Sequence, residues 1–463
     1  MKLWRDYLRE VGHLPTRWGW RPIRIPFGTG PEFDFVSRTR STHRSINTDH
    51  CLIKNMNVLP NPLGMPEALD GVRVLDCSQI LAGPFCSMLL ADMGADVIKV
   101  EKPDGGDDTR RMGPPFIGDE SVAFLAMNRN KRSVVLNFKD PAGVEALKRL
   151  AKDSDIVIEN YRTGTMERLG LGYEDLKKVN PEIIYCSISG FGRTGPYANR
   201  AGFDLVAQGM SGLMSFTGVP DSPPVKIGVP IADMNAGMFA TYGILTAYIH
   251  KLRKGEGQYL EVSLLEAAIA YTVWESGSYF ATGDVPGPLG SSHRLSAPYQ
   301  ALRTKDGHIN IGAPNQSNYE RFCRALGRAD LIERDEFKDN ANRLVNREAL
   351  EIELEKTLIA RTSEQWLEVM DEAGVPAGPI LNMSEVWGDE QVQARDLDVP
   401  LEHPTAGTVR NIGLAAKLYG TPGRITEPAP VFAQHTREVL IEAGYTADEI
   451  DAMVASGAVV LGG

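Results

Sequence analysis

The stretch VRVLDCSQILAGPFCSMLLADMGADVIKVE, residues 72–101, decides the fold class of this chain. The apolar run 72–75 predicts a short buried strand, and a tight loop follows it. The run 85–93 predicts a helix, and residues 96–101 predict a second strand. Strand, helix and strand in this order form a βαβ unit with parallel strands. The stretch has no G-x-G-x-x-G pattern, so it does not support a nicotinamide cofactor.

The same unit is repeated further along the chain. A helical pattern near 141–152 leads to an apolar strand at 155–159, and another near 173–178 leads to a strand at 183–189. Repeated βαβ units predict a mostly parallel sheet with helices on both faces. The first half of the chain is therefore predicted to be a doubly wound α/β domain.

The second half has a different pattern. Period-2 runs at 299–304 and 308–312 flank Lys305-Asp306-Gly307 and predict a hairpin, and helical patterns follow it. The first residues are rich in Arg, Trp, Pro and Gly, and Met56 and Met65 are alternative starts. We expect a poorly ordered extension at 1–66, a large α/β domain at 67–282, a linker or flap at 283–295, a smaller α+β domain at 296–395, and a C-terminal segment at 396–463 that packs back on the large domain.

Composition excludes several classes of function. The 463 residues are 43% hydrophobic and carry a net charge of −11, which argues against nucleic acid as a partner. The five cysteines form no C-x-x-C pair and the histidines form no H-x-x-x-H pair, so we expect no metal site. Scattered cysteines also fit a reducing, cytoplasmic location. The absence of a run of about 18 apolar residues predicts no contact with a membrane.

Two basic stretches follow predicted elements, at 128–133 and at 159–162. Loops at the strand ends of such sheets are where ligands bind, and positive charge there suits a phosphorylated ligand. A solvated basic surface explains the same residues equally well, so both interpretations stay open.

The stretch Pro230–Gly237 (PIADMNAG) contains the main candidate for chemistry. A helical pattern runs from about Asn235 to Lys254, so Asp233 is expected where a helix begins. Aspartate there can cap the helix, or it can be a nucleophile that the positive end of the helix dipole keeps ionised. The small residues Ala236 and Gly237 would let a substrate approach. Local pattern leaves both roles open, and caps are much commoner.

Several stretches together resemble the class III CoA-transferases (the CaiB/BaiF type), which include formyl-CoA transferase and carnitine CoA-transferase. The similar segments, in order, are 69–76 (LDGVRVLD), 82–84 (AGP), 94–101 (GADVIKVE), 130–133 (NKRS), 157–160 (VIEN), the segment around Asp233, 297–307 and 374–379 (GVPAGP). The resemblance covers about 68–450. It implies a Rossmann-like large domain with a smaller domain, in an interlocked homodimer.

The resemblance also implies a role for Asp233. As the catalytic carboxylate, Asp233 would attack an acyl-CoA thioester, form a mixed anhydride and then an aspartyl-CoA thioester, and pass CoA to a carboxylic acid. Covalent catalysis of this kind splits a difficult exchange into easier steps. The implied partners are an acyl-CoA, a carboxylic acid and a second copy of the chain, with no permanently bound cofactor.

The CoA contacts implied by the resemblance lie in four loops. They are Gln79, Ile80, Leu81, Ala82, Lys102, Leu136, Lys139, Asn160, Tyr161 and Arg168. The Gly- and Pro-rich loop 283–292 is a candidate flap, although it lacks the consecutive glycines of formyl-CoA transferase.

Two other functions remain open. A 2-methylacyl-CoA racemase needs opposed acid/base groups, and similar racemases have a His-Asp pair where this chain has Phe203-Asp204. Phenylalanine cannot move a proton, which favours a transferase, and Asp204 is expected to cap the helix 205–210. A non-catalytic CoA-binding protein would have lost the nucleophile, whereas Asp233 is present. The donor acyl-CoA and the acceptor acid stay undetermined.

Overall fold

The computed structural model describes residues 66–462. The expected extension 1–66, including Met56 and Met65, therefore lies outside the described residues except for Pro66. No helix in the described part is long and apolar enough to cross a membrane.

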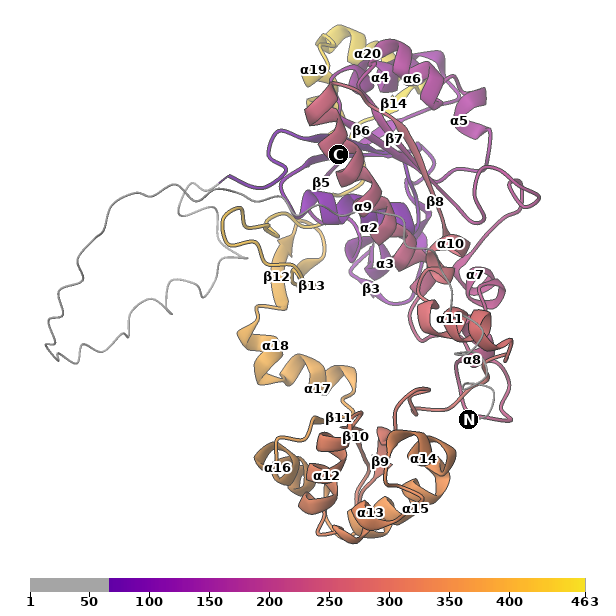
Figure 1. The fold of residues 1–463 in the computed structure, drawn as a ribbon. Coiled ribbons are helices and arrows are strands. Elements are labelled where there is room, and N and C mark those ends of the chain that lie inside the picture. The colour runs from indigo at the N-terminus through magenta and orange to yellow at the C-terminus, as the bar shows by residue number, and fades with distance from the viewer. Residues whose placement is uncertain (1–65, 463) are drawn as a thin grey trace, which may run out of the picture. The chain divides into compact units, whose positions relative to one another are not determined.

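A seven-stranded sheet organises the large domain (Figure 1). In spatial order its strands are β14 (Val459–Val460), β5 (Lys131–Leu136), β2 (Asp96–Glu101), β1 (Arg73–Asp76), β6 (Ile156–Glu159), β7 (Ile184–Ser189) and β8 (Tyr259–Ser263). All neighbours are parallel except β14, which pairs antiparallel with β5. The order changes direction between β1 and β6, and ligands bind in the crevice at such a point. The βαβ unit expected at 72–101 is confirmed.

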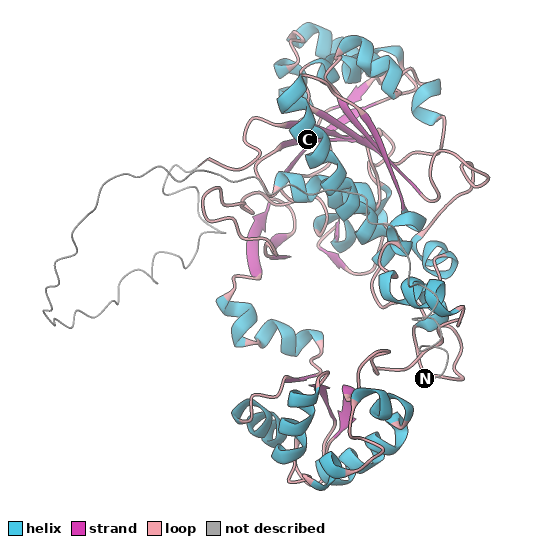
Figure 2. Ribbon diagram, in the orientation of Figure 1, coloured by secondary structure: helices cyan, strands magenta, loops and turns pink. Residues whose placement is uncertain are grey.

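Helices cover both faces of this sheet (Figure 2). Successive residues of β1 enter different cores, Val74 on one face and Leu75 on the other, and both are fully buried. The first core is completed by α2 (Ala82–Ala91), α7 (Asp204–Met210), α8 (Leu213–Phe216), α9 (Ile231–Lys254) and α10 (Leu264–Ile269). The second is completed by α4 (Pro141–Lys152), α5 (Thr165–Arg168), α6 (Tyr173–Val179), α19 (Thr436–Glu442) and α20 (Ala447–Ser456). The fold is thus mixed α/β, as expected.

A separate core surrounds a three-stranded antiparallel sheet of β9 (Tyr299–Arg303), β10 (His308–Gly312) and β11 (Ala377–Pro379). The hairpin expected at 299–312 is confirmed, with His308 opposite Arg303. Its helices are α12 (Gln316–Ala325), α13 (Asp330–Glu333), α14 (Asn340–Val345), α15 (Arg347–Leu358) and α16 (Ser363–Glu372). The remaining elements are η1 (Asp108–Arg111), β3 (Phe116–Ile117), β4 (Glu120–Ser121), α3 (Val122–Leu125), α11 (Val273–Thr282), α17 (Met383–Gly388), α18 (Glu390–Ala394), β12 (Asp398–His403) and β13 (Gly407–Ile412).

Three differences from the expected elements matter most for the arrangement of the large domain. Helix α9 begins at Ile231 rather than near Asn235, so Asp233 lies inside its first turn. Strand β5 begins at Lys131, so residues 131–133 are strand rather than loop. The C-terminal segment 396–463 holds β12, β13, α19, α20 and the edge strand β14, and its last three elements pack against the large sheet.

Candidate active site

The carboxyl ends of β1, β2, β5 and β6 and the segments that follow them meet at one edge of the central sheet, and they hold all ten residues expected to contact CoA. Two cavities lie among these loops. The outer cavity, of 540 Å³, is lined by six of the ten, Gln79, Lys102, Leu136, Lys139, Tyr161 and Arg168. The inner cavity, of 270 Å³, is lined by Gln79, Ile80, Leu81, Ala82, Asn160 and Tyr161 together with Asp233. The two cavities adjoin, because Gln79 and Tyr161 line both.

The outer cavity has the character of a phosphate site. Lys139 and Arg168 are exposed on its wall. Lys102 Nζ lies 2.5 Å from Asp108 Oδ1, so part of its charge is already balanced. Clustered cations of this kind attract phosphate groups. Leu136 is only 1% exposed and belongs to the second core, so its side chain contributes little surface to the cavity.

Asp233 does not cap its helix. The residue before α9 is Pro230, and the Ala232 N–H in the first turn donates to Asp204 Oδ1 at 2.8 Å. The other Asp204 oxygen accepts from the Gln208 side chain at 2.7 Å. Asp204 therefore caps α9, and the expectation that it caps the helix at 205–210 is wrong, because α7 already includes Asp204 as its first residue.

The carboxylate of Asp233 is left without a donor among residues 66–462. Burial, with a smaller contribution from the neighbouring Asp204 carboxylate, raises the pKa of Asp233 to about 7. Burial thus opposes the ionisation of Asp233 that the helix dipole is expected to favour. An unpaired, half-buried carboxylate is a better nucleophile than a fully solvated one, because part of its hydration is lost.

The small residues after Asp233 serve packing rather than substrate access. Ala236 and Gly237 are both fully buried on the face of α9 that meets α2. A Cβ on Gly237 would lie 2.7 Å from the Ala82 carbonyl oxygen and 2.9 Å from the Phe85 ring. The expectation that these two residues admit the substrate is wrong. The close approach instead holds the start of α2, with its cavity-lining Ala82, next to the start of α9.

Asn160 is occupied by the loop after β1. Its side-chain oxygen accepts from Gln79 N at 2.8 Å, and its side-chain nitrogen donates to Gln79 O at 2.7 Å. Asn160 thus fixes the backbone of Gln79, which lines both cavities. Its main effect on the ligand site is to hold Gln79 in place.

The basic stretch 128–133 is not a phosphate site. Arg129 pairs with Asp92 at 2.7 Å, Lys131 with Asp76 at 3.1 Å, and Arg132 with Asp96 at 2.7 Å. Neither the ligand interpretation nor the solvated one holds for these cations, because each is bound to a carboxylate within the fold. In the stretch 159–162, by contrast, Arg162 is exposed and lines the inner cavity.

Several residues of the inner cavity were not evident from the sequence. Arg193, Arg200 and Phe203 line it from the segment after β7. Arg193 pairs with Glu159 at 2.6 Å and donates to Tyr161 O at 2.8 Å. The turn at 190–193 after an apolar strand was the available signal, since loops there face the ligand edge.

The described residues contain no group of three His, Cys, Asp or Glu side chains that could hold a metal ion. The chemistry that this site can perform without one is nucleophilic attack by Asp233 on a group delivered past Gln79 and Tyr161.

Comparison with known proteins matches residues 69–436 to CoA-transferase family III. A succinyl-CoA:glutarate CoA-transferase from Mus musculus is 40% identical over 396 residues, which are 84% of this chain and 90% of that protein. A succinate–glutarate CoA-transferase from Agrobacterium fabrum is 39% identical over 380 residues, 81% of this chain and 95% of that protein. A crystal structure of a CaiB/BaiF family protein from Brucella suis is similar with a TM-score of 0.74 and 37% identity, covering 82% of this chain and all of that one.

Proposed function

This chain belongs to CoA-transferase family III, and we propose that it moves CoA from an acyl-CoA thioester to a carboxylic acid through covalent intermediates on Asp233. One observation carries the proposal: the unpaired Asp233 carboxylate lies in a cavity that adjoins a cationic cavity of a size suited to the nucleotide end of CoA. The change of direction in the strand order between β1 and β6 supports a Rossmann-like arrangement, in which nucleotides bind at this edge.

The first half of the reaction loads Asp233. An Asp233 oxygen attacks the thioester carbonyl, the C–S bond breaks, and the CoA thiolate leaves a mixed anhydride. The thiolate then attacks the Asp233 carbonyl carbon, which releases the donor acid as a carboxylate and leaves an aspartyl-CoA thioester. No net proton is consumed, and the energy of the thioester is retained.

The second half reverses these steps with another acid. The acceptor carboxylate attacks the aspartyl-CoA carbonyl, CoA leaves as thiolate, and a new mixed anhydride forms. Attack of the thiolate on the acceptor carbonyl yields the new acyl-CoA and frees Asp233. Arg193 and Asn160 order the loops around these steps, so that the reacting atoms stay aligned.

The relatives suggest the substrate class. Both proteins compared above are named for succinyl and glutarate substrates. We assign succinyl-CoA as donor and a short dicarboxylic acid as acceptor. The exposed Arg162 and Arg200 on the inner cavity supply cations for a second carboxylate.

Racemase activity receives less support from the inner cavity. Phe203 is 70% exposed and lines the cavity where a racemase needs a proton carrier. Asp204 is engaged by Ala232 N and Gln208, so it is poorly placed to exchange protons with a substrate.

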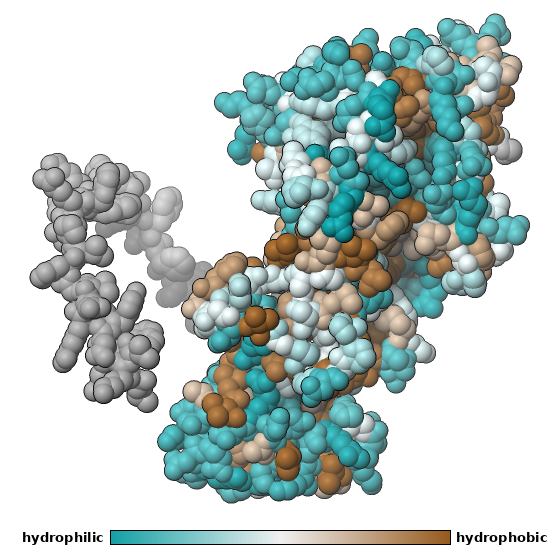
Figure 3. Space-filling view, turned by 90° about the vertical axis from the view of Figure 1, so that its right-hand side faces the viewer, coloured by the Kyte–Doolittle hydropathy of each residue, from teal (hydrophilic) through white to brown (hydrophobic). Residues whose placement is uncertain are grey.

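An interlocked homodimer is part of the same proposal. Helix α9 exposes an apolar stripe opposite its buried face, with the spacing of a helix-packing seam: Met238, Tyr242, Leu245, Ile249 and Leu252, which are 36–70% exposed. Figure 3 shows that apolar residues reach the surface on one face of the molecule. A second copy of the chain would bury the stripe.

Sedimentation should give a dimer mass, and the double substitution Tyr242→Glu with Ile249→Glu should weaken the dimer. A monomer mass for the unmodified protein would contradict this part of the proposal.

A cytoplasmic location is also proposed. The four buried free thiols of the described part suit a reducing compartment.

Trapping with hydroxylamine tests the covalent mechanism. The protein is incubated with a panel of acyl-CoAs and then with hydroxylamine, and its peptides are mapped by mass spectrometry, with Asp233→Ala as control. A hydroxamate on Asp233 that forms only with certain donors is expected, and it identifies the donor. An unmodified Asp233 with every donor, together with entry of solvent deuterium at the α-carbon of a 2-methylacyl-CoA, would replace the proposal with racemisation.

A further inference from the structure

The loop after β1 contains a backbone conformation that its side chain disfavours. Ile80 has a φ of +71°, in the left-handed region that β-branched residues rarely adopt. Ile80 lines the inner cavity beside Gln79, the residue shared by both cavities. Such a conformation persists only where its surroundings hold it, and it commonly marks a ligand site.

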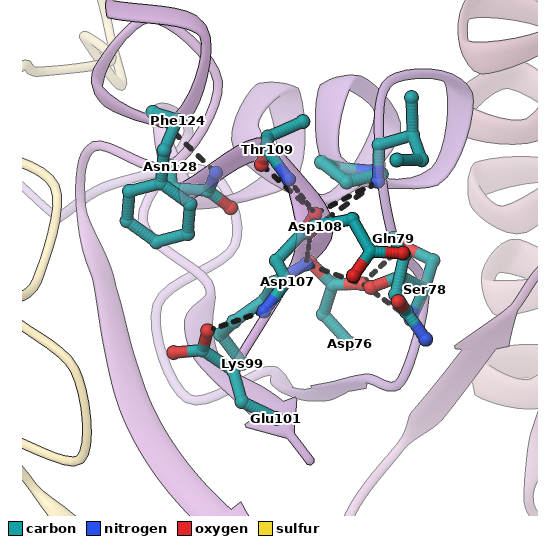
Figure 4. Close-up of polar contacts among 12 residues, drawn as sticks. Asp76, Ser78, Gln79, Lys99, Glu101, Asp107, Asp108, Thr109, Phe124 and Asn128 are labelled. Atoms are coloured by element: carbon teal, nitrogen blue, oxygen red, sulfur yellow. Dashed lines mark hydrogen bonds and ion pairs between the residues drawn. The ribbon is translucent and has the colours of Figure 1, made fainter. Parts of the chain in front are cut away.

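One buried carboxylate from another segment holds this residue. The Ile80 N–H donates to both oxygens of Asp107, at 3.2 and 3.3 Å. Asp107 is 1% exposed, follows β2, and also accepts from Thr109 N at 2.9 Å (Figure 4). Its own N–H donates to Glu101 at 3.0 Å, so the carboxylate is fixed from several sides.

Lys99 ties Asp107 to the same loop. Its fully buried Nζ lies 2.8 Å from Asp107 Oδ2 and donates to Ser78 O at 2.7 Å. Burial would raise the pKa of Asp107, but Lys99 holds it well below its usual range. Lys99 therefore favours the ionised form of Asp107, which is a strong acceptor for the Ile80 N–H.

The number of buried ion pairs around Lys99 is larger than the stability of the fold needs. Lys99 also lies 3.9 Å from Asp76, which Lys131 approaches to 3.1 Å, and all three side chains are completely buried. Burying ion pairs costs desolvation that largely offsets their attraction, so apolar residues would stabilise the fold as well. What apolar residues cannot supply is a fixed acceptor for the loop.

We propose that Asp107, held by Lys99, is a positioning residue that keeps residues 78–81 in their observed conformation. In this conformation Gln79 lies between the two cavities and lines both, so that the CoA thioester reaches Asp233. The inference rests on the proposed function, because it takes the two cavities as the CoA site.

Calorimetric binding of CoA to the full chain, with transfer kinetics, tests this role. Asp107→Asn should weaken CoA binding about tenfold and lower kcat/KM at least as much, because the amide keeps only one of the two oxygens that accept from Ile80, Thr109 and Lys99 and loses the charge that pairs with Lys99. Asp92→Asn is the matched control, because Asp92 is equally buried and paired with Arg129 but its side chain accepts no hydrogen bond from residues 78–81. It should lower the melting temperature similarly and leave CoA affinity within about twofold.

Rescue distinguishes positioning from general destabilisation. Glycine adopts a positive φ freely, so in an Ile80→Gly background Asp107→Asn should cost less than about threefold in CoA affinity. If Asp107→Asn does not fold, Asp107→Glu keeps the charge while moving the oxygens by one methylene, and it should also weaken CoA binding.

Equal effects of Asp107→Asn and Asp92→Asn, or an undiminished loss in the Ile80→Gly background, would overturn the inference alone. Wild-type protein that binds no CoA would overturn the proposed function together with it.

Discussion

Asp107 and Asp233 lie beside the same loop, yet their carboxylates have opposite surroundings. Asp107 accepts from a lysine, a threonine and two backbone N–H groups, and its pKa is held below its usual range. Asp233 has no donor in the described part of the chain, and burial raises its pKa to about 7. Asp107 is buried and has received partners in exchange for water, whereas Asp233 is half-buried and has received none among the described residues.

The difference separates carboxylates that hold geometry from one that is free to react. A fully paired carboxylate fixes the atoms that donate to it, and it is a poor nucleophile because its lone pairs are engaged. An unpaired carboxylate in a cavity is destabilised before substrate arrives, and a covalent bond to an acyl group removes its charge.

The largest expected effect comes from removing the reactive carboxylate. Asp233→Ala should lower kcat for CoA transfer by about 10⁴-fold or more, because no other group can carry the covalent intermediate. CoA affinity should change little, in contrast to Asp107→Asn. Calorimetry and steady-state transfer assays measure the two quantities, and a residual rate within tenfold of wild type would show that Asp233 is not the nucleophile.

The two aspartates should affect stability with opposite signs. The folded-state pKa of Asp233 is raised, so its destabilising effect is absent below about pH 4 and complete above about pH 7. Asp233→Asn should therefore increase the free energy of unfolding by about 2–4 kcal/mol at pH 8 and leave it unchanged at pH 4. Asp107→Asn should lower it by about 3–5 kcal/mol at pH 8, because Lys99 loses its partner. Denaturant titrations at the two pH values test both signs, and a loss of stability in Asp233→Asn would contradict the contrast.

The pH profile of transfer should follow Asp233. Only the ionised carboxylate attacks, so kcat/KM should fall about tenfold per pH unit below pH 7 and level off above it. A rate that is flat down to pH 5 would mean that the free enzyme's carboxylate is already ionised there.

Asp204→Asn should show how much the charge of Asp204 contributes to the pH profile of transfer. The asparagine oxygen can still accept from Ala232 N, while the negative charge near Asp233 is lost. The midpoint of the kcat/KM profile should then move to lower pH by about 0.5–1 unit, the smallest effect of the series. An unchanged midpoint would assign the raised pKa of Asp233 to burial alone.

Local sequence pattern was sufficient for the framework. The apolar runs at 72–75 and 96–101 predicted β1 and β2, because parallel strands buried on both faces have no polar alternation. The local pattern failed at Lys131–Ser133, where charged residues belong to a buried strand. These charges are tolerated because Asp76 and Asp96 pair with Lys131 and Arg132, and Asp92 pairs with the preceding Arg129. Those partners are more than 30 residues away, so no window along the chain contains both members of a pair.

At the candidate site, too, the sequence predicted some features and not others. All ten expected CoA residues line the two cavities, because strand order brings their loops to one edge. The cap on α9 comes from Asp204, 28 residues before Ala232, and the two-residue strand β14 carries no periodicity. The positive φ of Ile80 has no signal in the sequence, since glycine is the residue expected there.

The contrast between the two aspartates can be measured directly by ¹³C NMR titration of aspartate carboxyl carbons in the free protein, with Asp233→Asn and Asp107→Asn to assign the resonances. The account predicts that the Asp233 signal titrates with a pKa near 7 and that the Asp107 signal stays ionised to the lowest pH at which the protein is folded. An Asp233 carboxylate that titrates near 4, like a solvated aspartate, would contradict the claim that the fold leaves this group buried and unpaired for nucleophilic attack.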